Sequence, residues 1–158
     1  MAHHLLEREI RQVKPLSLVD QAAANLHRSS SILLQEVASY LTTKGISPKQ
    51  YNILRILRGA GKEGLCCGDV AARLVSPDPD TTRLLDRLAR REWIRRQQGH
   101  PDRRVVLIRI TPAGLKLLES VEGEVQAIQS HQFQHFKESE LRKLISLLES
   151  LRDRKGRA

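Results

Sequence analysis

The sequence predicts a mainly α-helical fold with one small β-hairpin, and three observations support this prediction. Over most of the chain, apolar residues recur at spacings of three and four, as they do along one face of a helix. The spacing changes at 94–98 and 105–110, two short β-like runs on either side of a turn that contains Gly99 and Pro101. Only 3% of the residues are aromatic, so we expect leucine, isoleucine and valine to fill the core.

The first long helix is predicted over 16–44. Ser17 and Asp20 fit a capping box at its start, and Gly45 fits a C-terminal stop. Apolar or small residues form one stripe along it, at positions 16, 19, 23, 26, 30, 33, 37 and 40. A second helix is expected over 48–58, because Ser47 suits the cap position and a proline follows it.

Two short helices are predicted next, with a tight turn between them. The first is expected over 69–74, after a very short strand at 65–67. The second is expected over 79–91, with Asp78 as its cap and Pro79 at its first position. Its inner face would consist of Leu84, Leu85 and Leu88.

Two helices are predicted after the hairpin. Thr111 suits the cap position and Pro112 the first position of a long helix whose apolar stripe reaches toward Phe136. The last helix carries the apolar residues Leu141, Leu144, Ile145, Leu148 and Leu151. This last stripe lies outside the short helices and the hairpin, so we expect a second copy of the chain to cover it in a homodimer.

The excess of basic residues is concentrated in the middle of the chain. The net charge is +9, and the segment 47–111 holds 14 basic against 7 acidic residues, a net charge of +7. The flanks hold 13 basic against 11 acidic residues, a net charge of +2. A solvated charged face is the simplest explanation of such a segment, but its localisation favours a polyanionic partner, and we expect double-stranded DNA.

The arginines of the predicted helix at 79–91 favour DNA as that partner. Arg83, Arg87 and Arg90 lie at i, i+4 and i+7, opposite the leucine face, where guanidinium groups could take guanine edges or phosphates. An ion pair between Asp86 and Arg90 within the helix is the competing interpretation of part of this pattern. Two short helices with arginines on the second are typical of a helix-turn-helix that places its second helix in the major groove.

Two blocks of the sequence resemble the MarR family of bacterial transcriptional regulators. The first, 80–88, reads Asp-Thr-Thr-Arg-Leu-Leu-Asp-Arg-Leu. The second, 102–114, contains the wing signature of that family, an Asp-x-Arg followed by a strand and a glycine, here Asp102, Arg104 and Gly114. The resemblance spans about 16–152. It implies a winged helix-turn-helix with long N- and C-terminal dimerisation helices, and a triangular homodimer.

The resemblance also implies which residues touch DNA. Helix residues would enter the major groove, while Arg104 would enter the minor groove with Asp102 holding its guanidinium in place. The bottom-up argument agrees for Arg104, because an arginine on a protruding hairpin suits a narrow, electronegative minor groove. The predicted DNA-binding residues are Thr81, Thr82, Arg83, Arg87, Arg103 and Arg104.

These observations predict a single domain over 1–158 with a DNA-binding part at 47–111 and dimerisation helices at 16–44 and 112–155. We expect it to be a sequence-specific transcriptional regulator, acting as a repressor, that binds a pseudo-palindromic operator. The resemblance adds release by a small-molecule effector. A non-specific architectural DNA-binding protein is the alternative.

The sequence departs from the pattern of the family at two places. Glu92 stands where the family usually has glycine at the end of the recognition helix, which predicts a different or strained C-cap. Asp78 and Asp80 lie near the expected path of the phosphates and would repel them unless they cap the helix or pair with Arg83.

Cysteine and histidine pairs suggest a redox-responsive or metal-responsive regulator as a further alternative. Cys66 and Cys67 are adjacent, where a disulfide is strained, and no activating base stands beside them in sequence, so structural thiols are favoured. His131 and His135 lie at i, i+4, but two ligands on one helix need a third for a metal, so we expect no metal site.

Other function classes are disfavoured. The sequence has no phosphate-cradling glycine loop and no nucleophile elbow, so we expect no enzymatic activity and no cofactor. No stretch approaches about 18 uncharged apolar residues, and charged residues at 7–11 occupy the place of a signal peptide's apolar region. We therefore expect a cytoplasmic protein without a membrane partner.

Overall fold

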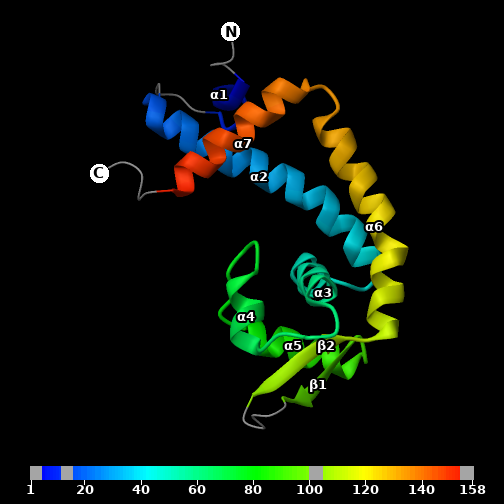
Figure 1. Ribbon diagram of the computed structural model, residues 1–158. Coiled ribbons are helices and arrows are strands. Elements are labelled where there is room, and N and C mark those ends of the chain that lie inside the picture. Colours follow the sequence, from blue (N-terminus) through cyan, green and yellow to red (C-terminus); the bar gives the residue numbers. More distant parts are fainter. Residues whose placement is uncertain (1–4, 12–15, 100–104, 154–158) are drawn as a thin grey trace.

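The computed structural model describes residues 5–11, 16–99 and 105–153, and its mainly α-helical architecture with one hairpin confirms the predicted fold class. Its elements are α1 (Leu5–Glu9), α2 (Leu18–Thr43), α3 (Pro48–Ala60), α4 (Cys67–Ala72), α5 (Thr81–Arg90), β1 (Ile94–Gln98), β2 (Val106–Ile110), α6 (Pro112–Phe133) and α7 (Glu138–Arg152). The helices α3, α4 and α5 and the hairpin form one part, and α1, α2 and α7 form another (Figure 1). The long helix α6 runs from the first part to the second.

The start signals read from the sequence hold for the two longest predicted helices and for α3. The Ser17 hydroxyl accepts a hydrogen bond from the Asp20 amide at 3.1 Å. Ser47 and Gln50 form a reciprocal capping box at the start of α3. The Thr111 hydroxyl accepts from the Gly114 amide at 3.1 Å, with Pro112 at the first position of α6. Each cap satisfies an amide that has no partner inside its helix.

The helix α4 begins two residues before the predicted start. The Cys66 thiol occupies the cap position and accepts from the Asp69 amide at 3.4 Å, which places Cys67 at the first helical residue. The strand predicted at 65–67 is reduced to an isolated bridge between Leu65 and Ile108, with backbone hydrogen bonds of 3.0 and 2.8 Å.

The helix α5 begins two residues after the predicted start. Asp78 does not cap it, because its carboxylate accepts from the Asp80 amide at 2.7 Å and pairs with Lys49. Asp80 occupies the cap position without a side-chain hydrogen bond, and the helix starts at Thr81. The prediction that Pro79 opens the helix is therefore wrong.

The end of α5 is closed by a left-handed residue. Glu92 has a φ of 57°, and its amide donates to the Ala89 carbonyl at 2.9 Å. The Trp93 amide donates to the Leu88 carbonyl at 3.1 Å, which completes the two hydrogen bonds of a Schellman motif. The altered C-cap expected from the sequence is present, with a glutamate in the conformation that favours glycine.

The hairpin has two chemically different faces. β1 and β2 are antiparallel, with Ile94 opposite Ile110 and Arg95 opposite Arg109. Because side chains alternate along a strand, Ile94 and Ile108 lie on one face, where they are 2% and 1% exposed. The opposite face carries the two arginines.

The start of α6 is pressed against the hairpin. A Cβ added at Gly114 would lie 2.2 Å from the Trp93 carbonyl oxygen and 2.8 Å from the Ile110 side chain. The Thr111 amide donates to that same carbonyl at 3.0 Å, and its hydroxyl donates to the Glu92 carbonyl at 2.6 Å. These contacts fix α6 relative to α5 and the hairpin.

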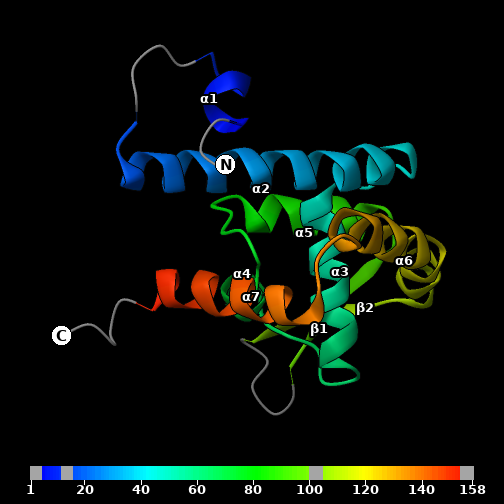
Figure 2. The same ribbon diagram turned by 90° about the horizontal axis from the view of Figure 1, so that it is seen from above.

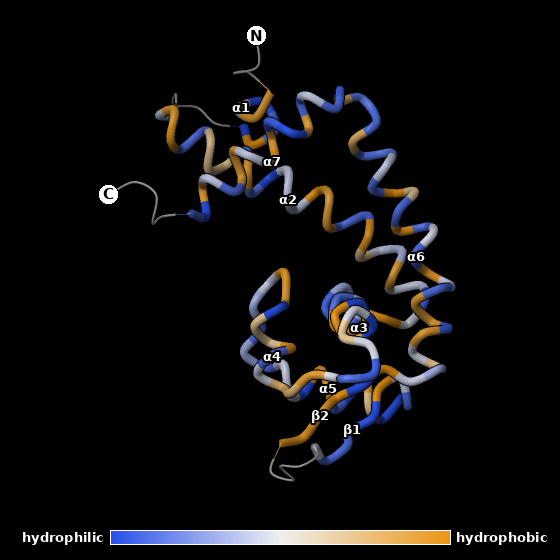
Figure 3. The backbone as a smooth tube through the Cα atoms, viewed as in Figure 1, coloured by the Kyte–Doolittle hydropathy of each residue, from blue (hydrophilic) through white to orange (hydrophobic). Residues whose placement is uncertain are grey.

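The core lies between α3, α5, the hairpin and the first half of α6, with the C-terminal end of α2 closing it. Its fully buried side chains include Leu41, Ile53, Leu54, Leu57, Leu85, Leu88, Ile108, Leu118 and Val121. In contrast, α7 has no buried residue, and apolar residues recur along both α2 and α7 (Figure 3). Seen from above, α7 extends beside α2 but stays apart from it (Figure 2). None of the described helices is long and apolar enough to span a membrane.

Candidate nucleic-acid interface

The helix α5 separates its leucines from its arginines. Leu84, Leu85 and Leu88 are buried against the core, with at most 9% exposure. Arg83 and Arg87 are exposed on the other side of the helix. The turn between α4 and α5 and the burial of the leucines therefore present two guanidinium groups on one solvent-facing helix surface, as a recognition helix requires.

Arg83 forms a weak ion pair with Asp80. One guanidinium nitrogen lies 3.6 Å from the Asp80 carboxylate, and the two side chains are 76% and 64% exposed. Exposed pairs of this kind contribute at most about 1 kcal/mol, so a phosphate or a base edge can replace the carboxylate. The pairing expected for Asp80 is thus present.

The two threonines at the start of α5 differ in their surroundings. Thr82 is exposed, and its hydroxyl lies 3.7 Å from the Cys67 sulfur. Thr81 is only 4% exposed, and its hydroxyl donates to the Asp78 carbonyl at 2.7 Å. The Thr81 side chain is therefore not available on the arginine face, whereas Thr82 is.

The turn before α5 is held by residues of α3. The Asn52 side-chain oxygen accepts from the Val75 amide at 3.1 Å, and Lys49 pairs with Asp78. The hydrogen bond from Lys49, together with one from the Asp80 amide, holds the pKa of Asp78 below its ordinary value. Asp78 therefore stays ionised, but an adjacent cation offsets the repulsion of phosphates that the sequence suggested.

Asp86 links α5 to the hairpin. Its carboxylate lies 2.7 Å from the Arg96 guanidinium, with the side chains 38% and 40% exposed. The ion pair expected between Asp86 and Arg90 is therefore replaced by one between elements. Sequence reasoning missed Arg96 as a partner, because only the packing of β1 on α5 brings positions 86 and 96 together.

The remaining predicted site residues lie in the segment between the two strands of the hairpin. Asp102, Arg103 and Arg104 lie outside the described residues, between Gly99 and Val105. The described strands β1 and β2 flank that segment. The roles of Asp102, Arg103 and Arg104 therefore stay predictions.

The cysteines lie at the start of α4, with Cys66 at its cap position, and not in the strand that the sequence predicted at 65–67. Both are free and partly exposed. The Cys66 thiol donates to the Asp69 carboxylate at 3.1 Å while its sulfur caps α4. This capping contact favours structural thiols, and the redox alternative stays untested.

The histidines do not share one helix. The helix α6 ends at Phe133, so His131 lies in its last turn and His135 lies beyond it, with its ring centroid 4.3 Å from that of Phe136. Within the described ranges, no group of three or more His, Cys, Asp or Glu residues is placed to hold a metal ion.

Comparisons with known proteins agree with this arrangement. Residues 46–106 match the model of the MarR family. The chain is 32% identical over 108 residues to the HTH-type transcriptional regulator YpoP of Bacillus subtilis, covering 68% of this chain and 75% of that protein. The structure is similar to that of a MarR transcription factor from Planctomyces limnophilus, with 36% identity, a TM-score of 0.66, and coverage of 86% and 98% of the two chains.

A further similar structure is a complex with DNA. It is that of S. aureus MepR, with 23% identity, a TM-score of 0.74, and coverage of 82% of this chain and 94% of that chain. Proteins of this class are DNA-binding regulators and not enzymes, which confirms the expectation that the chain has no enzymatic activity. The chain therefore belongs to the MarR family of winged helix-turn-helix transcriptional regulators.

Proposed function

We propose that the chain acts in the cytoplasm as a homodimeric repressor that binds a pseudo-palindromic operator in double-stranded DNA. The observation that supports this most directly is the exposed arginine face of α5, opposite a buried leucine face. The solved complex of S. aureus MepR with DNA supports the same function.

In this proposal α5 enters the major groove. Thr82, Arg83 and Arg87 contact it from the exposed face of the helix, where an arginine can bind guanine O6 and N7 with two hydrogen bonds. Arg103 and Arg104 of the wing contact the adjacent minor groove and its phosphates, with Asp102 orienting Arg104. The helix-turn-helix and hairpin of 47–111 form the DNA-binding part, flanked by dimerisation helices at 16–44 and 112–155.

The apolar groove between α2 and α7 supports the dimer. Its volume is about 610 Å³, and it is lined by apolar residues of α2, α7 and the end of α6, among them Leu33, Phe133, Leu144 and Leu148. On its rim, Leu147 and Leu151 are 60% and 61% exposed. Such an unshielded apolar surface is typical of a protein interface, and the matching surface of a second copy would cover it.

Binding to the upstream region of its own gene, compared with random duplex at matched salt, tests the proposal. Arg83→Ala and Arg87→Ala should weaken operator binding by about 5-fold to 150-fold, because each bidentate contact discriminates bases by roughly 1–3 kcal/mol, and should weaken random-duplex binding much less. Arg142→Ala is the matched control, because it removes the same charge from α7, on the far side of the chain from α5 (Figure 1).

The alternative is non-specific architectural binding, and it predicts a different pattern. Both arginine variants would then lose affinity equally on operator and random duplex. For either function, a plot of log affinity against log salt concentration should have a slope of about −0.9 for each phosphate contact. Binding that is insensitive to salt would contradict any DNA-binding function.

The sign of one further substitution tests the wing. Asp102→Ala removes a negative charge from a surface that faces DNA, which by itself would tighten binding. If Asp102 orients Arg104, the substitution should instead weaken binding, as Arg104→Ala does, but to a smaller extent. Tighter binding of a folded Asp102→Ala variant would show that Asp102 is only a turn residue.

Release of DNA by a small-molecule effector is the last part of the proposal, and it follows from the family resemblance. A preformed complex with the operator, titrated with small organic anions and aromatic compounds, should dissociate at constant salt with at least one of them. If none of these compounds dissociates the complex, release by an effector is contradicted. Operator occupancy would then depend only on the concentration of the protein.

A further inference from the structure

The three residues that follow α5 contact the ends of two of the helices that are proposed to form the dimer. Arg91 contacts the end of α2, whereas Glu92 and Trp93 contact the start of α6. Residues 91–93 are called the junction below, because they lie between the recognition helix and the dimerisation helices. The contacts that fix this junction also fix the position of α5 in a dimer.

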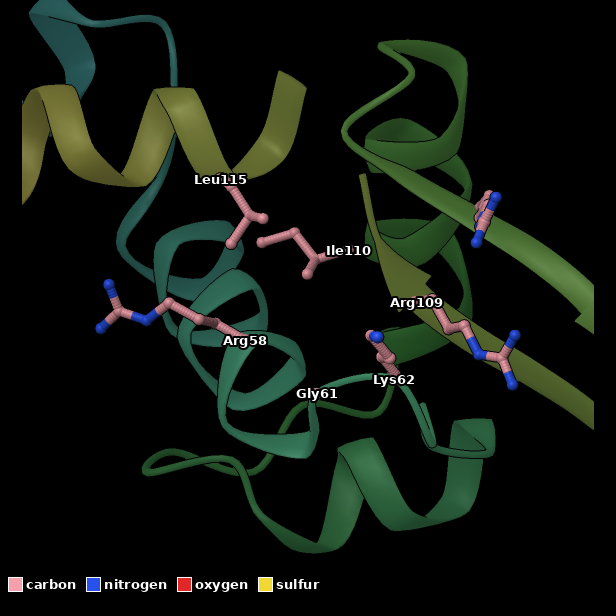
Figure 4. A pocket seen from close by; sticks show the side chains of 7 residues that line it. Arg58, Gly61, Lys62, Arg109, Ile110 and Leu115 are labelled. Atoms are coloured by element: carbon pink, nitrogen blue, oxygen red, sulfur yellow. The ribbon is translucent and has the colours of Figure 1, made fainter. Parts of the chain in front are cut away.

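The α6 side of the junction consists of backbone hydrogen bonds and apolar packing. The Glu92 carbonyl accepts from the Thr111 hydroxyl at 2.6 Å, and the Trp93 carbonyl accepts from the Thr111 amide at 3.0 Å. The side chains of Ile110, from β2, and Leu115, from α6, point toward one another and join the hairpin to α6 (Figure 4). None of these contacts depends on the side chain at position 91.

The α2 side of the junction depends on one side chain, that of Arg91. Its guanidinium donates to the carbonyl of Gly45, a residue 46 positions earlier in the sequence. Gly45 has a φ of 70°, and its amide donates to the Thr42 carbonyl at 2.9 Å. The Ile46 amide donates to the Leu41 carbonyl at 3.1 Å. These two hydrogen bonds form a Schellman motif, so the Gly45 carbonyl lies just outside the end of α2.

The surroundings of Arg91 favour a guanidinium over other groups. The C-terminal end of a helix carries a partial negative charge, which attracts a cation beside Gly45. The Arg91 guanidinium carbon also lies over the Trp93 ring, 4.7 Å from the ring centroid. A planar guanidinium stacks on an aromatic ring while its N–H groups donate in the plane, whereas the ammonium group of lysine does not stack.

A contact with a DNA phosphate is the simpler interpretation of an exposed arginine at the end of α5. Arg91 is exposed, as are Arg83 and Arg87. It differs from Arg83, whose ion pair within α5 is 3.6 Å long, because both of its contacts hold it against its own chain and one of them leads to another element. The contact adds a directional hydrogen bond to the non-directional burial of the leucine face.

We propose that Arg91 is a positioning residue for DNA binding, which ties the end of the recognition helix to the end of α2. In a dimer, this contact sets the separation of the two α5 helices. The second statement rests on the proposed function, because it requires a homodimer that binds two half-sites. Such half-sites lie about 34–36 Å apart, and a displacement by about 3.4 Å, one base-pair step, changes the preferred spacing.

The first test uses the folded chain without DNA. Trp93 is the only tryptophan, so a chain labelled with 5-fluorotryptophan gives one fluorine resonance. We expect Arg91→Gln and Arg91→Lys, each checked for folding by circular dichroism, to shift or broaden this resonance, because both remove the planar cation from the ring. Arg142→Gln, which removes the same charge from α7, should leave it unchanged. An unchanged resonance in both Arg91 variants would overturn the contact itself.

The second test measures binding to the palindrome from the upstream region of its own gene, with the half-sites at their natural spacing or moved by one base pair. Arg91→Gln and Arg91→Lys should both weaken binding at the natural spacing by about fivefold, the effect of one hydrogen bond. They should weaken binding to the respaced palindromes less, so the preference for one spacing decreases. Both should keep the salt dependence of the parent chain, because no phosphate contact is lost.

Two outcomes of the second test would overturn the proposal. If Arg91→Lys binds like the parent, while Arg91→Gln weakens all spacings equally and reduces the salt slope by about 0.9, Arg91 is a phosphate contact. If both variants keep the spacing preference of the parent, α5 is positioned without Arg91. A parent chain without any spacing preference would instead contradict the proposed dimeric binding, and the fluorine resonance would still decide whether Arg91 holds α5 to α2.

Discussion

A single residue, Glu92, has a backbone conformation that its side chain does not favour. Its φ of 57° closes α5, and an L-residue with a Cβ in this region costs about 1–2 kcal/mol. Glu92→Gly should therefore raise the free energy of unfolding by about 0.5–1 kcal/mol, after the greater chain entropy of glycine in the unfolded state is counted. Chemical denaturation monitored by circular dichroism measures this change.

The matched control for that prediction is Glu92→Gln. It removes the charge but keeps the Cβ, so the free energy of unfolding should stay within about 0.5 kcal/mol of the parent. Equal stabilisation by both substitutions would assign the effect to charge repulsion and would leave the left-handed backbone without an energetic consequence.

Residue positions could be predicted from spacing in part of the site. The exposed positions of Arg83 and Arg87 follow from their place opposite the leucines. The same spacing could have identified Thr81 as inward-facing, because 81, 84, 85 and 88 form one i, i+3, i+4, i+7 series. The expectation that it contacts DNA rested on its nearness to the helix start and ignored this periodicity.

At the scale of elements, the junction between the hairpin and α6 depends on the absence of one side chain. Gly114→Ala would place a Cβ 2.2 Å from the Trp93 carbonyl oxygen, and this clash involves rigid backbone. We expect the variant to lose about 1–3 kcal/mol of unfolding free energy, despite the better helix propensity of alanine. Thermal or chemical denaturation measures the loss.

Gly123→Ala is the control within the same helix. A Cβ at Gly123 meets nothing within 4 Å, so this variant should be as stable as the parent or more stable by up to about 1 kcal/mol. If both alanine variants behave alike, the close approach at Gly114 is not a packing constraint.

The contact between α3 and α6 should make stability depend on acid pH. Hydrogen bonds from Arg58 hold the pKa of Glu122 below its ordinary value of 4.5, against a smaller opposing effect of burial. A carboxyl group whose pKa is lowered by folding stabilises the native state above its unfolded pKa, and this stabilisation is lost as the pH falls through its folded pKa. The contribution of the Arg58–Glu122 pair to the free energy of unfolding should therefore decrease below about pH 4.5.

Glu122→Gln should destabilise the chain by about 1 kcal/mol at pH 7, a value set by the partial exposure of the pair. The difference from the parent should shrink toward pH 3, as measured by denaturation at a series of pH values. Glu124→Gln, at an exposed position of the same helix, should show no such pH-dependent difference.

The number and order of the long elements could be predicted from the sequence, whereas some boundaries could not. The starts of α2, α3 and α6 depend on caps within four residues, and such local signals are visible in one dimension. The start of α5 depends on a contact between Lys49 and Asp78, 29 residues apart, which takes away the carboxylate that would otherwise cap the helix. The start of α4 depends on a thiol as an unusual capping acceptor.

At the scale of the whole molecule, the exposed leucines of α7 predict that the chain dimerises. Leu147→Glu places a charge on the rim of the groove between α2 and α7 and should shift the chain from dimer to monomer at micromolar concentration. Sedimentation equilibrium measures this shift. Ser146→Glu adds the same charge next to it, outside the groove lining, and should remain dimeric. A parent chain that sediments as a stable monomer would contradict the dimer itself.

The helix α6 is attached so firmly at its N-terminal end that the hairpin and α5 should move with it. Its 22 residues span about 33 Å, and at one end Thr111 and Gly114 fix it to the hairpin and to the last turn of α5. If α6 pivots by about 6° about its C-terminal end, its N-terminal end and the attached arginine face of α5 move by about 3.4 Å. This distance is the rise of one base pair. A rotation of only a few degrees would thus be enough to shift the chain by one step along the double helix.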